Sequence, residues 1–305
     1  LSLQGDNNMQ NRSIYNSDHE LFRDNVRRFF RAELEPNIEQ WEEESVVPRS
    51  LWEKAAENGF LCCGVPEEYG GPGADFLYNM VLSEETGYAI GGASVGFSVQ
   101  ADIVAYYLLS AGTEEQKKYW LPKMVTAEKI AAIGMTEPGV GSDLKNLRTT
   151  AVRDGDEYVI NGQKTFITNG QNCDFVLVAC TTDPSAGGRG ISLIIVETDR
   201  AGFSRGRNLD KIGQKAADTS EMFFQDVRVP ISNLVGEEGE GFRIMMRELP
   251  RERITIACRA QAEAQRAFDI TRDYVKERKA FGKAIFEFQN TQFTLADMKT
   301  NLEVG

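Results

Sequence analysis

Apolar residues recur every three or four positions through the first part of the chain. In the first charged segment, the residues with this spacing are Leu21, Val26, Phe29 and Phe30. The same period returns in three later segments, residues 78–89, 99–111 and 113–126. This is the period of an amphipathic α-helix. Residues 18–127 are therefore predicted to be helical, with a break at the Gly- and Pro-rich segment 66–73 and an N-cap at Thr113.

The pattern changes over residues 130–235, where short runs of Thr, Val, Ile and Phe are separated by Gly, Asn and Asp. Such runs are typical of strands. The predicted strands are residues 148–152, 157–160, 165–168, 175–180, 191–197 and 220–228. Asp154-Gly155 indicates a hairpin between the first two. Because no helix is predicted between the strands, we expect a small antiparallel barrel or sandwich rather than a parallel sheet.

A helical period returns at about residue 241. Pro250 lies within it and is expected to kink or restart the helix, because proline has no N–H to donate. A last amphipathic helix is predicted over residues 291–304. Two helices leave an apolar face without a partner, so we expect a C-terminal bundle that is truncated or completed by another subunit. The predicted fold class is α+β multidomain, with a helical domain (1–129), an antiparallel β domain (130–239) and the start of a C-terminal helical domain (240–305).

Composition excludes several classes of function. The net charge of −12 disfavours a general nucleic-acid binder. The single histidine, His19, makes a His-based metal site, a Ser-His triad and a Cys-His dyad unexpected. Five cysteines, an odd number, fit no disulfide framework or zinc site. No apolar run is long enough to span a membrane, and the polar residues 1–12 do not have the pattern of a secretory signal.

The densest group of candidate ligand-binding residues is segment 134–143, GMTEPGVGSD. Gly139 and Gly141 allow backbone N–H groups to approach an anion or a planar ring, and Thr136 and Ser142 add hydroxyl groups. A plain glycine-rich turn has the same composition, so the segment alone supports both interpretations equally. It is neither a Walker loop nor a dinucleotide-binding GxGxxG after a strand.

Two shorter motifs favour structural roles when each is taken alone. Residues 162–170, GQKTFITNG, place an aromatic and a threonine on a strand that ends in an Asn-Gly turn, and taken alone they favour a core Phe166 and a hairpin turn. Residues 278–282, RKAFG, combine Arg278, a candidate phosphate ligand, with Phe281, which can stack on a ring. A basic helix end capped by Gly282 is the preferred interpretation of the second motif by itself.

The charged segment 247–253, RELPRER, carries Glu248 and Glu252 four positions apart. A solvated helix surface is the usual meaning of such a run. Pro250 and the apolar residues on both sides indicate instead a perturbed helix with one buried side. A carboxylate that faces an apolar cavity has a raised pKa and can act as a general base near neutral pH.

Together these motifs resemble the acyl-CoA dehydrogenase family. MTEPGVGSD, FITNG, LPRER and RKAFGK occur in that family's order and at about its spacing, and the similarity extends over residues 15–305. The resemblance implies an N-terminal helical domain, a middle β domain and a C-terminal four-helix domain. It also implies a homotetramer that binds FAD between the last two domains. Both a bacterial cytoplasm and a mitochondrial matrix fit as the location; secretion does not.

The resemblance assigns roles to particular residues. Those implied to contact the flavin are Ile133, Met135, Thr136, Gly141, Ser142, Phe166, Ile167 and Thr168. Those implied to reach the FAD of a neighbouring subunit are Arg278, Phe281 and Gln289. Those implied to contact acyl-CoA are Ser142, Arg189, Gly190, Arg243, Pro250, Arg251 and Arg253. Residues 94–103 are expected to set the depth of the acyl cavity.

The implied reaction is α,β-dehydrogenation of a fatty acyl-CoA to a trans-2-enoyl-CoA, a step of fatty acid β-oxidation. Most family members carry the catalytic glutamate near the C-terminus, whereas long-chain and isovaleryl members carry it on the helix after the β domain. Glu252 has that position here, and ELPRERITIA is most like the long-chain branch. Glu252 would take the α-proton, flavin N5 would accept the β-hydride, and electron-transfer flavoprotein would then receive the electrons.

Several alternatives stay open at this point. An isovaleryl-CoA or other short branched-chain dehydrogenase would use the same base. An acyl-CoA oxidase would return the electrons to oxygen. A non-catalytic flavoprotein fragment is a rival from a different class, and Glu248 is the rival candidate for the base.

Overall fold

The fold combines helices with one large sheet. The computed structural model describes residues 14–305, and for Ala93 the backbone only. Residues 1–12, on which the expectation about a secretory signal rests, lie outside the described residues. No helix in the described part of the chain is long and apolar enough to cross a membrane.

Helices form the first region, as the apolar period predicts. They are α1 Ser17–Phe29, α2 Ile38–Glu44, α3 Arg49–Glu57, α4 Phe76–Tyr88, α5 Ala105–Ala111 and α6 Glu114–Val125. Two π-helical turns, Phe30–Leu34 and Val99–Val104, follow α1 and precede α5. Thr113 caps α6 as predicted, because its hydroxyl accepts a hydrogen bond from the N–H of Gln116. The side chain of Gln116 in turn accepts one from the N–H of Thr113.

The middle region is an eight-stranded sheet in the order β6-β7-β3-β2-β4-β5-β8, with β1 paired to β4. The strands are β1 Ala131–Gly134, β2 Thr150–Asp154, β3 Glu157–Thr168, β4 Phe175–Thr181, β5 Ile191–Glu197, β6 Phe203–Asn208, β7 Thr219–Pro230 and β8 Leu234–Val235. The predicted runs 157–160 and 165–168 both belong to β3. The sequence pattern did not predict β1, β6 or β8.

Antiparallel pairing dominates the sheet, as predicted, but two pairings are parallel. β1 runs parallel to β4, with Ala131 opposite Phe175, and β2 meets β4 in the same sense at Thr150 and Thr181. β1 can do so because a long excursion through β2 and β3 separates it from β4. The predicted hairpin joins β2 to β3, and Gly155 supplies a φ of 62° in its turn.

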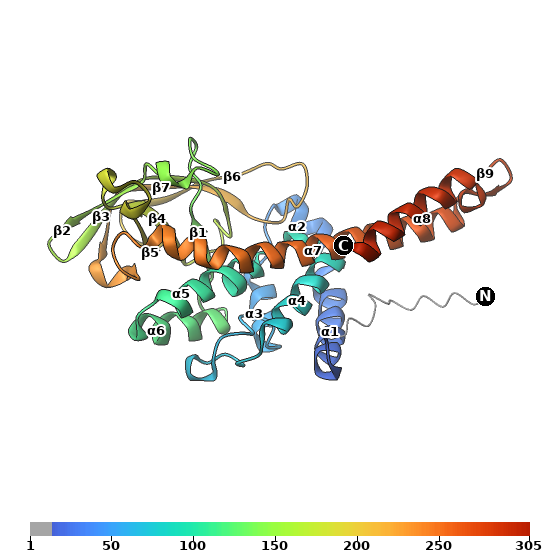
Figure 1. Ribbon diagram of the computed structural model, residues 1–305, viewed down its shortest axis with the longest axis horizontal. Coiled ribbons are helices and arrows are strands. Elements are labelled where there is room, and N and C mark those ends of the chain that lie inside the picture. Colours follow the sequence, from blue (N-terminus) through green and yellow to red (C-terminus); the bar gives the residue numbers. More distant parts are fainter. Residues whose placement is uncertain (1–13) are drawn as a thin grey trace.

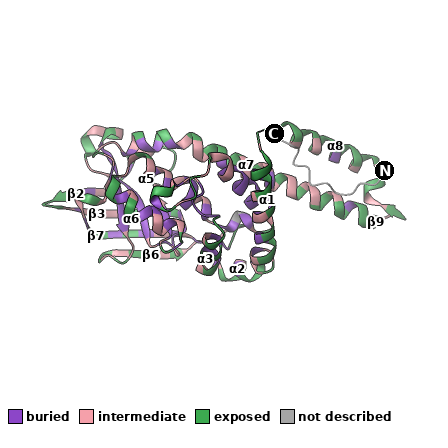
Figure 2. Cartoon of the chain, turned by 90° about the horizontal axis from the view of Figure 1, so that it is seen from below, coloured by how far each residue is buried: buried purple, intermediate pink, exposed green. Residues whose placement is uncertain are grey.

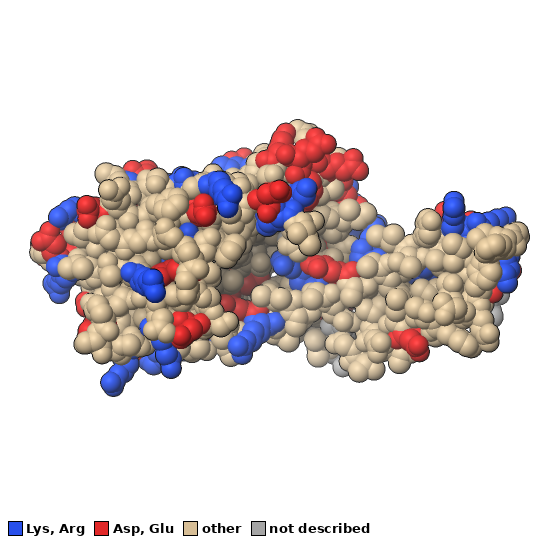
Figure 3. Space-filling view, turned by 90° about the horizontal axis from the view of Figure 1, so that it is seen from above, with Lys and Arg blue, Asp and Glu red and all other residues tan. Residues whose placement is uncertain are grey.

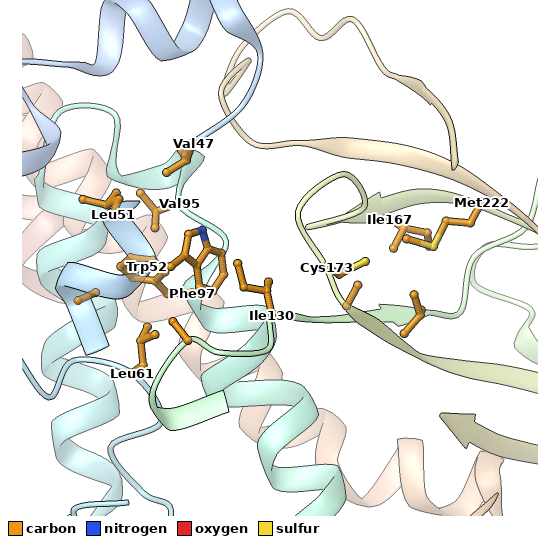
Figure 4. Close-up of a cluster of buried hydrophobic side chains, with 14 of the residues drawn as sticks. Val47, Leu51, Trp52, Leu61, Val95, Phe97, Ile130, Ile167, Cys173 and Met222 are labelled. Atoms are coloured by element: carbon orange, nitrogen blue, oxygen red, sulfur yellow. The ribbon is translucent and has the colours of Figure 1, made fainter. Parts of the chain in front are cut away.

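A shared hydrophobic core joins the helices to the sheet (Figure 4). Trp52 of α3 is 1% exposed, and its ring lies 4.7 Å from that of Phe97. Ile130 continues the cluster towards the sheet residues Ile167 and Met222. Fully burying such a side chain contributes about 1.5–3 kcal/mol. The helical region and the sheet therefore cannot separate without a large loss of stability.

α1 and α4 are joined by buried ion pairs as well as by apolar contacts. Arg23 donates to Glu84 at 2.7 Å, and Arg27 donates two hydrogen bonds of 2.7 Å to Glu85. Both carboxylates are almost completely buried. Because removing one partner of such a pair leaves an uncompensated charge, these bonds fix how the two helices are aligned.

α7 (Gly241–Glu277) is a continuous helix of 37 residues that lies between the sheet and the N-terminal helices (Figure 1). Pro250 lies inside it, so the prediction that the helix restarts there is wrong. An interior proline costs about 3 kcal/mol. Packing on both sides of the proline offsets this cost: Ile244 and Met245 are buried before it, and Ser83 of α4 donates to the carbonyl of Thr255 after it.

The distal part of α7 and α8 (Gln289–Val304) form a hairpin that projects from the body of the molecule (Figure 1). Its tip is a two-residue turn between β9 (Lys279–Ala280) and β10 (Lys283–Ala284). Phe281 and Gly282 form this turn with φ of 53° and 81°. The predicted last helix is confirmed, whereas the predicted Gly282 helix cap is instead part of a turn. Most of the hairpin surface is exposed or half-exposed (Figure 2).

Gly87 lies where α4 and α7 come into close contact. A Cβ there would lie 2.3 Å from the carbonyl oxygen of Arg259. We expect Gly87→Ala to lower the free energy of unfolding by about 1–3 kcal/mol, because the two helices must move apart. Urea denaturation measures the change. Gly139→Ala is the control, since a Cβ there meets no atom within 4 Å. An equal loss in both variants would contradict the packing argument.

Candidate active site

A cavity of about 580 Å³ lies where the sheet, the segment before α5 and α7 meet. Its sheet wall consists of Ile133, Met135, Thr136, Phe166, Ile167 and Thr168. Other walls come from residues 95–103, 211–219 and 252–259. The surface is visibly hollowed near the middle of the molecule (Figure 3). Six of the eight residues that the resemblance assigns to the flavin are therefore brought together, and they share this cavity with Glu252.

A buried ion pair holds the loop that follows β1. Lys164 of β3 donates to Glu137 at 2.8 Å and to the carbonyl of Met135 at 3.1 Å. Glu137 also accepts hydrogen bonds from the N–H groups of Arg148 and Thr149. Although burial opposes its ionisation, Lys164 and these donors together lower the pKa of Glu137. The charged pair fixes the backbone that carries Met135 and Thr136 into the cavity wall.

The glycines of this loop leave its outer part open. A Cβ at Gly139 or Gly141 would meet no atom within 4 Å, so no neighbouring protein atom requires glycine at these positions. Gly141 and Ser142 are exposed and lie outside the cavity wall. What glycine provides is access to the backbone from solvent, which is the property the sequence predicted for binding an anion or a ring.

Phe166 projects into the cavity because β3 is irregular at this point. The register between β3 and β7 shifts between Lys164 and Ile167, and Phe166 has a φ of 58°. A bulge of this kind re-aims a side chain out of the regular alternation of a strand. Phe166 is consequently 65% exposed while Ile167 is buried. The interpretation of Phe166 as a core aromatic is wrong, and its ring is available to a ligand.

Glu252 extends from α7 into the same cavity. The hydroxyl of Tyr107, a fully buried residue of α5, donates to Glu252 Oε1 at 2.8 Å. Burial raises the pKa of Glu252, the hydrogen bond from Tyr107 lowers it, and the nearby Glu248 raises it; the net shift is upward. A half-buried carboxylate with a raised pKa and a fixed orientation has the properties of a general base.

Glu248, the rival base, has a different environment. It lies one turn earlier on α7, is buried, and accepts a hydrogen bond of 3.1 Å from Arg247. It is not among the residues that line the cavity. The geometry therefore favours Glu252 over Glu248 as the group that reaches a ligand.

The arginines and the proline next to Glu252 do not line the cavity. Arg251 stacks on Tyr106 at 3.8 Å and on Phe76 at 4.7 Å, outside the cavity wall. Pro250 and Arg253 are exposed. The structure thus places these three predicted substrate contacts around the base on α7, and none of them lines the cavity.

The remaining predicted substrate contacts lie near the start of α7. Arg189 and Gly190 end the turn before β5, and Arg243 lies in the first turn of α7, where it pairs with Glu240. Lys145, which follows Ser142, has its ammonium 5.6 Å from the ring of Phe242. The 142–145 loop, the turn before β5 and the start of α7 therefore approach one another at one surface.

Arg278, Phe281 and Gln289 are not brought to the cavity. They lie at the tip of the α7–α8 hairpin, at the far end of the molecule from the sheet (Figure 1). Phe281 is 96% exposed. Within one chain these residues are unable to share a ligand with the cavity, so their predicted role requires a second chain.

The sequence did not single out three residues that shape the site. Tyr107 orients Glu252, Asp102 lines the cavity wall, and Lys164 supports the loop after β1. Residues 94–103 were expected to set the depth of the acyl cavity, but nothing in the sequence distinguished Asp102 from the rest of that segment. A lysine in a strand of mostly apolar and Thr residues was the one signal for Lys164.

The cavity fits a flavin on its own chemistry. A planar ring needs a flat apolar contact and polar groups at its edge. Phe166 and Ile133 supply apolar surface, and the hydroxyls of Thr136 and Thr168 form no side-chain hydrogen bond with the described residues. Polar groups left free in a cavity wall are those that a bound ligand satisfies.

Comparison with known proteins places this geometry in a family context. The family models for the N-terminal, middle and C-terminal domains of acyl-CoA dehydrogenase match residues 16–128, 132–227 and 239–305. The long-chain specific acyl-CoA dehydrogenase of Sus scrofa is 46% identical over 293 residues, which cover 95% of this chain and 68% of that protein.

Solved structures show the same likeness. The crystal structure of an acyl-CoA dehydrogenase from Geobacillus kaustophilus has a TM-score of 0.93 and 52% identity, covering 95% of this chain and 77% of that one. A glutaryl-CoA dehydrogenase from Mycobacterium smegmatis in complex with FADH2 has a TM-score of 0.86 and 31% identity, covering 95% and 73%.

Proposed function

Because the chain belongs to the acyl-CoA dehydrogenase family of flavin-dependent oxidoreductases, we propose that it oxidises a fatty acyl-CoA to the trans-2-enoyl-CoA with Glu252 as the base. The observation that carries the proposal is the position of Glu252 in one cavity with Phe166, Thr136 and Thr168. A base and a ring-binding surface must lie together for a proton and a hydride to leave neighbouring carbons.

FAD is the proposed cofactor, held by the sheet wall of the cavity. The ring would contact Ile133, Met135, Phe166 and Ile167, with the hydroxyls of Thr136 and Thr168 at its polar edge. Gly141 and Ser142 would approach it from the open side of the loop. When bound, FAD supplies the acceptor for the β-hydride of the substrate.

Glu252 would remove the α-proton of the thioester. The cavity keeps this carboxylate half-buried, so its pKa is raised and it binds a proton more readily than an exposed glutamate. Tyr107 holds Glu252 Oε1 with a hydrogen bond of 2.8 Å, which leaves Oε2 to take the proton. Tyr107 is therefore a positioning residue for the base.

The CoA portion would extend towards the start of α7. Ser142, Arg189, Gly190 and Arg243 lie on the three segments that approach one another there. Exposed arginines suit the phosphates of CoA, since guanidinium groups bind them with two parallel hydrogen bonds. Pro250, Arg251 and Arg253 surround the base and are proposed to contact the substrate after side-chain movement.

A long-chain substrate is proposed from the relatives. Family members include short-chain and isovaleryl enzymes as well as long-chain ones. A base on α7 suits long-chain and isovaleryl enzymes alike, and the higher identity to a long-chain enzyme, 46% against 34% for an isovaleryl enzyme, favours the long-chain reaction. Electron-transfer flavoprotein is the proposed electron acceptor. A homotetramer is proposed because it would bring Arg278, Phe281 and Gln289 to a neighbouring subunit's cofactor.

Tyr107→Phe, which removes the hydroxyl that orients Glu252, should change the pH dependence of kcat/KM. The hydrogen bond from Tyr107 lowers the pKa of Glu252, so its loss in Tyr107→Phe raises that pKa further. Since the base acts only when ionised, the acid limb of kcat/KM should move to higher pH. Activity on this limb should fall by about tenfold, because a hydrogen bond to a charged group contributes about 1.5 kcal/mol. A pH–rate profile measures the shift.

Tyr106→Phe is the matched control for this prediction. Its hydroxyl lies 3.5 Å from Asn79 and makes no contact with Glu252. The acid limb should stay in place in this variant. An identical profile in both variants would show that Tyr107 does not act through Glu252.

The visible spectrum of the FAD-loaded enzyme tests the reaction. Under anaerobic conditions, palmitoyl-CoA should bleach the flavin absorbance, because the cofactor becomes reduced without an electron acceptor. Bleaching by isovaleryl-CoA alone would still support Glu252 as the base, but it would identify a short branched-chain acyl-CoA as the substrate. A flavin that neither thioester bleaches would contradict the proposed function.

A further inference from the structure

Asp102 is a buried carboxylate that the proposed reaction does not use. It lies on the π-helical turn Val99–Val104, is 4% exposed, and lines the same cavity as Glu252. Asn79 donates to its Oδ1 at 2.6 Å. Its Oδ2 accepts no hydrogen bond from the described residues. Burial raises the pKa of Asp102 to about 7. A carboxylate oxygen that has no partner among the described residues and belongs to a cavity wall is one that a bound ligand can satisfy.

Much of the wall around Asp102 is apolar. Val95, Val99 and Ile103 come from the same segment, and Ile256 comes from α7. Such a wall suits an unsubstituted hydrocarbon chain, and a carboxyl group within it is costly unless a ligand pairs with it. An aspartate here therefore points to a ligand that is not hydrocarbon throughout.

Arg259 supplies a second polar group at the same part of the cavity. It lies on the cavity-facing side of α7 with Glu252, Thr255 and Ile256. Its Nε lies 3.4 Å from Glu263, and its two terminal nitrogens donate to none of the described residues. Its charge, with that of Arg251, favours the ionised form of Asp102. The same cavity wall thus offers a free acceptor and a free donor, and the charge of one acts on the other.

A hydroxyl group matches this pair. It donates one hydrogen bond and accepts others, so it can satisfy a carboxylate oxygen and a guanidinium at once. The charged groups that line the cavity are Asp102 and Glu252 against Lys211 and Arg259, so the lining favours neither a carboxylate nor an ammonium over a neutral polar group. A plain methylene chain would leave both polar groups without partners.

We propose that Asp102 and Arg259 bind a hydroxyl group on the acyl chain, so that the enzyme selects hydroxylated fatty acyl-CoA thioesters. This inference rests on the proposed dehydrogenation, because it assigns the acyl chain to this cavity. Arg259 lies seven residues beyond Glu252, about 10 Å along the helix. Each bond of an extended chain advances about 1.2 Å. Ten ångströms correspond to about eight bonds, and because the long side chain of a helical residue points back towards the N-terminus, the guanidinium can meet the chain several bonds earlier. The hydroxyl is therefore expected about four to eight bonds beyond the carbon that Glu252 deprotonates, at C6 to C10.

The test compares decanoyl-CoA with its 6-, 8- and 10-hydroxy derivatives on the FAD-loaded enzyme. At least one derivative should have a kcat/KM ten or more times that of decanoyl-CoA, because the unsubstituted chain leaves Asp102 and Arg259 unpaired. A kcat/KM for every hydroxylated chain at or below that of decanoyl-CoA would overturn the inference. This comparison needs no variant, so it does not depend on the folding of one.

Two variants assign the preference to Asp102. Asp102→Leu should lower the ratio of hydroxylated to plain substrate by tenfold or more, and Asp102→Asn, which keeps the bond with Asn79, should lower it less. Ile103→Leu alters the neighbouring wall without its polarity and should keep the ratio. Equal ratios in the wild type and in Asp102→Leu would show that Asp102 does not bind the hydroxyl group.

A binding measurement separates this inference from the proposed function. Dissociation constants for the same thioesters can be read from the flavin spectrum of Glu252→Gln, which binds substrate without turning it over. Hydroxylated chains should bind at least tenfold more tightly. If decanoyl-CoA bleaches the wild-type flavin but no preference is found, only the hydroxyl inference fails. If none of these thioesters bleaches it, the proposed function fails, and the inference fails with it.

Discussion

Glu252→Gln should keep its FAD and lose dehydrogenase activity by about 10²–10⁴-fold, the contribution expected of a positioned general base. Glutamine has nearly the same shape as glutamate, so it can still accept the hydrogen bond from Tyr107, but it cannot take a proton. The residues proposed to hold the ring lie on the sheet wall, away from α7. The rate of anaerobic flavin bleaching by palmitoyl-CoA measures the loss, and the flavin absorbance measures cofactor content.

Glu248→Gln is the matched control on the same helix. Glu248 accepts a hydrogen bond from Arg247 and does not line the cavity. Its charge raises the pKa of Glu252, so removing it lowers that pKa and keeps the base ionised at neutral pH. Activity should stay near the wild-type value. A large loss in Glu248→Gln together with normal turnover in Glu252→Gln would reverse the assignment of the base.

Glu137→Gln should lower the free energy of unfolding by about 3–5 kcal/mol. The change leaves Lys164, whose side chain is 0% exposed, without its counter-charge. Glu137 also accepts hydrogen bonds from the N–H groups of Arg148 and Thr149. Because the substitution weakens these bonds too, the loop after β1 should lose its fixed shape as well. Because that loop carries Met135 and Thr136, FAD affinity should fall together with stability.

An exposed ion pair provides the control for this second variant. Glu128 pairs with Lys123 at 2.8 Å and has a half-exposed side chain. Glu128→Gln should change stability by less than about 1 kcal/mol, since exposed pairs contribute little. Urea denaturation of both variants measures the free energy of unfolding, and repeating it with added FAD measures how far the cofactor still stabilises each variant. Similar small changes in both would show that the buried pair does not hold the loop.

Local sequence signals predicted the parts of the fold that depend on local chemistry. The cap at Thr113 and the hairpin at Gly155 are both present, because each depends on a few neighbouring residues. The helical period predicted most of α4, α5 and α6. The parallel pairing of β1 with β4 depends on residues more than 40 positions apart, and no local pattern encodes it.

Tertiary packing explains the other differences. Pro250 has an intrinsic preference to end a helix, but contacts of α7 on both sides of it keep the helix continuous. Phe166 looked like a core residue until the register shift in β3 turned its ring outwards. Tyr107 and Asp102 lie in a segment of ordinary helical composition, and only the approach of α7 makes them parts of a site.

The family resemblance added what the residues could not supply separately. Each motif alone also had a structural interpretation, and their common order along the chain removed that ambiguity. The structure brings Ile133, Phe166 and Glu252 together from segments up to 119 positions apart. It leaves Arg278, Phe281 and Gln289 at the hairpin tip, where only a second chain can give them the predicted role.

Proton exchange at the α-carbon tests most directly whether Glu252 is the base. An acyl-CoA with sulfur in place of the β-carbon keeps its α-protons but has no β-hydride to lose, so the proton step is observed separately. In D2O, mass spectrometry should show deuterium entering this position with the wild-type enzyme and at least a hundredfold more slowly with Glu252→Gln. Equal exchange by the two enzymes would contradict the assignment of Glu252.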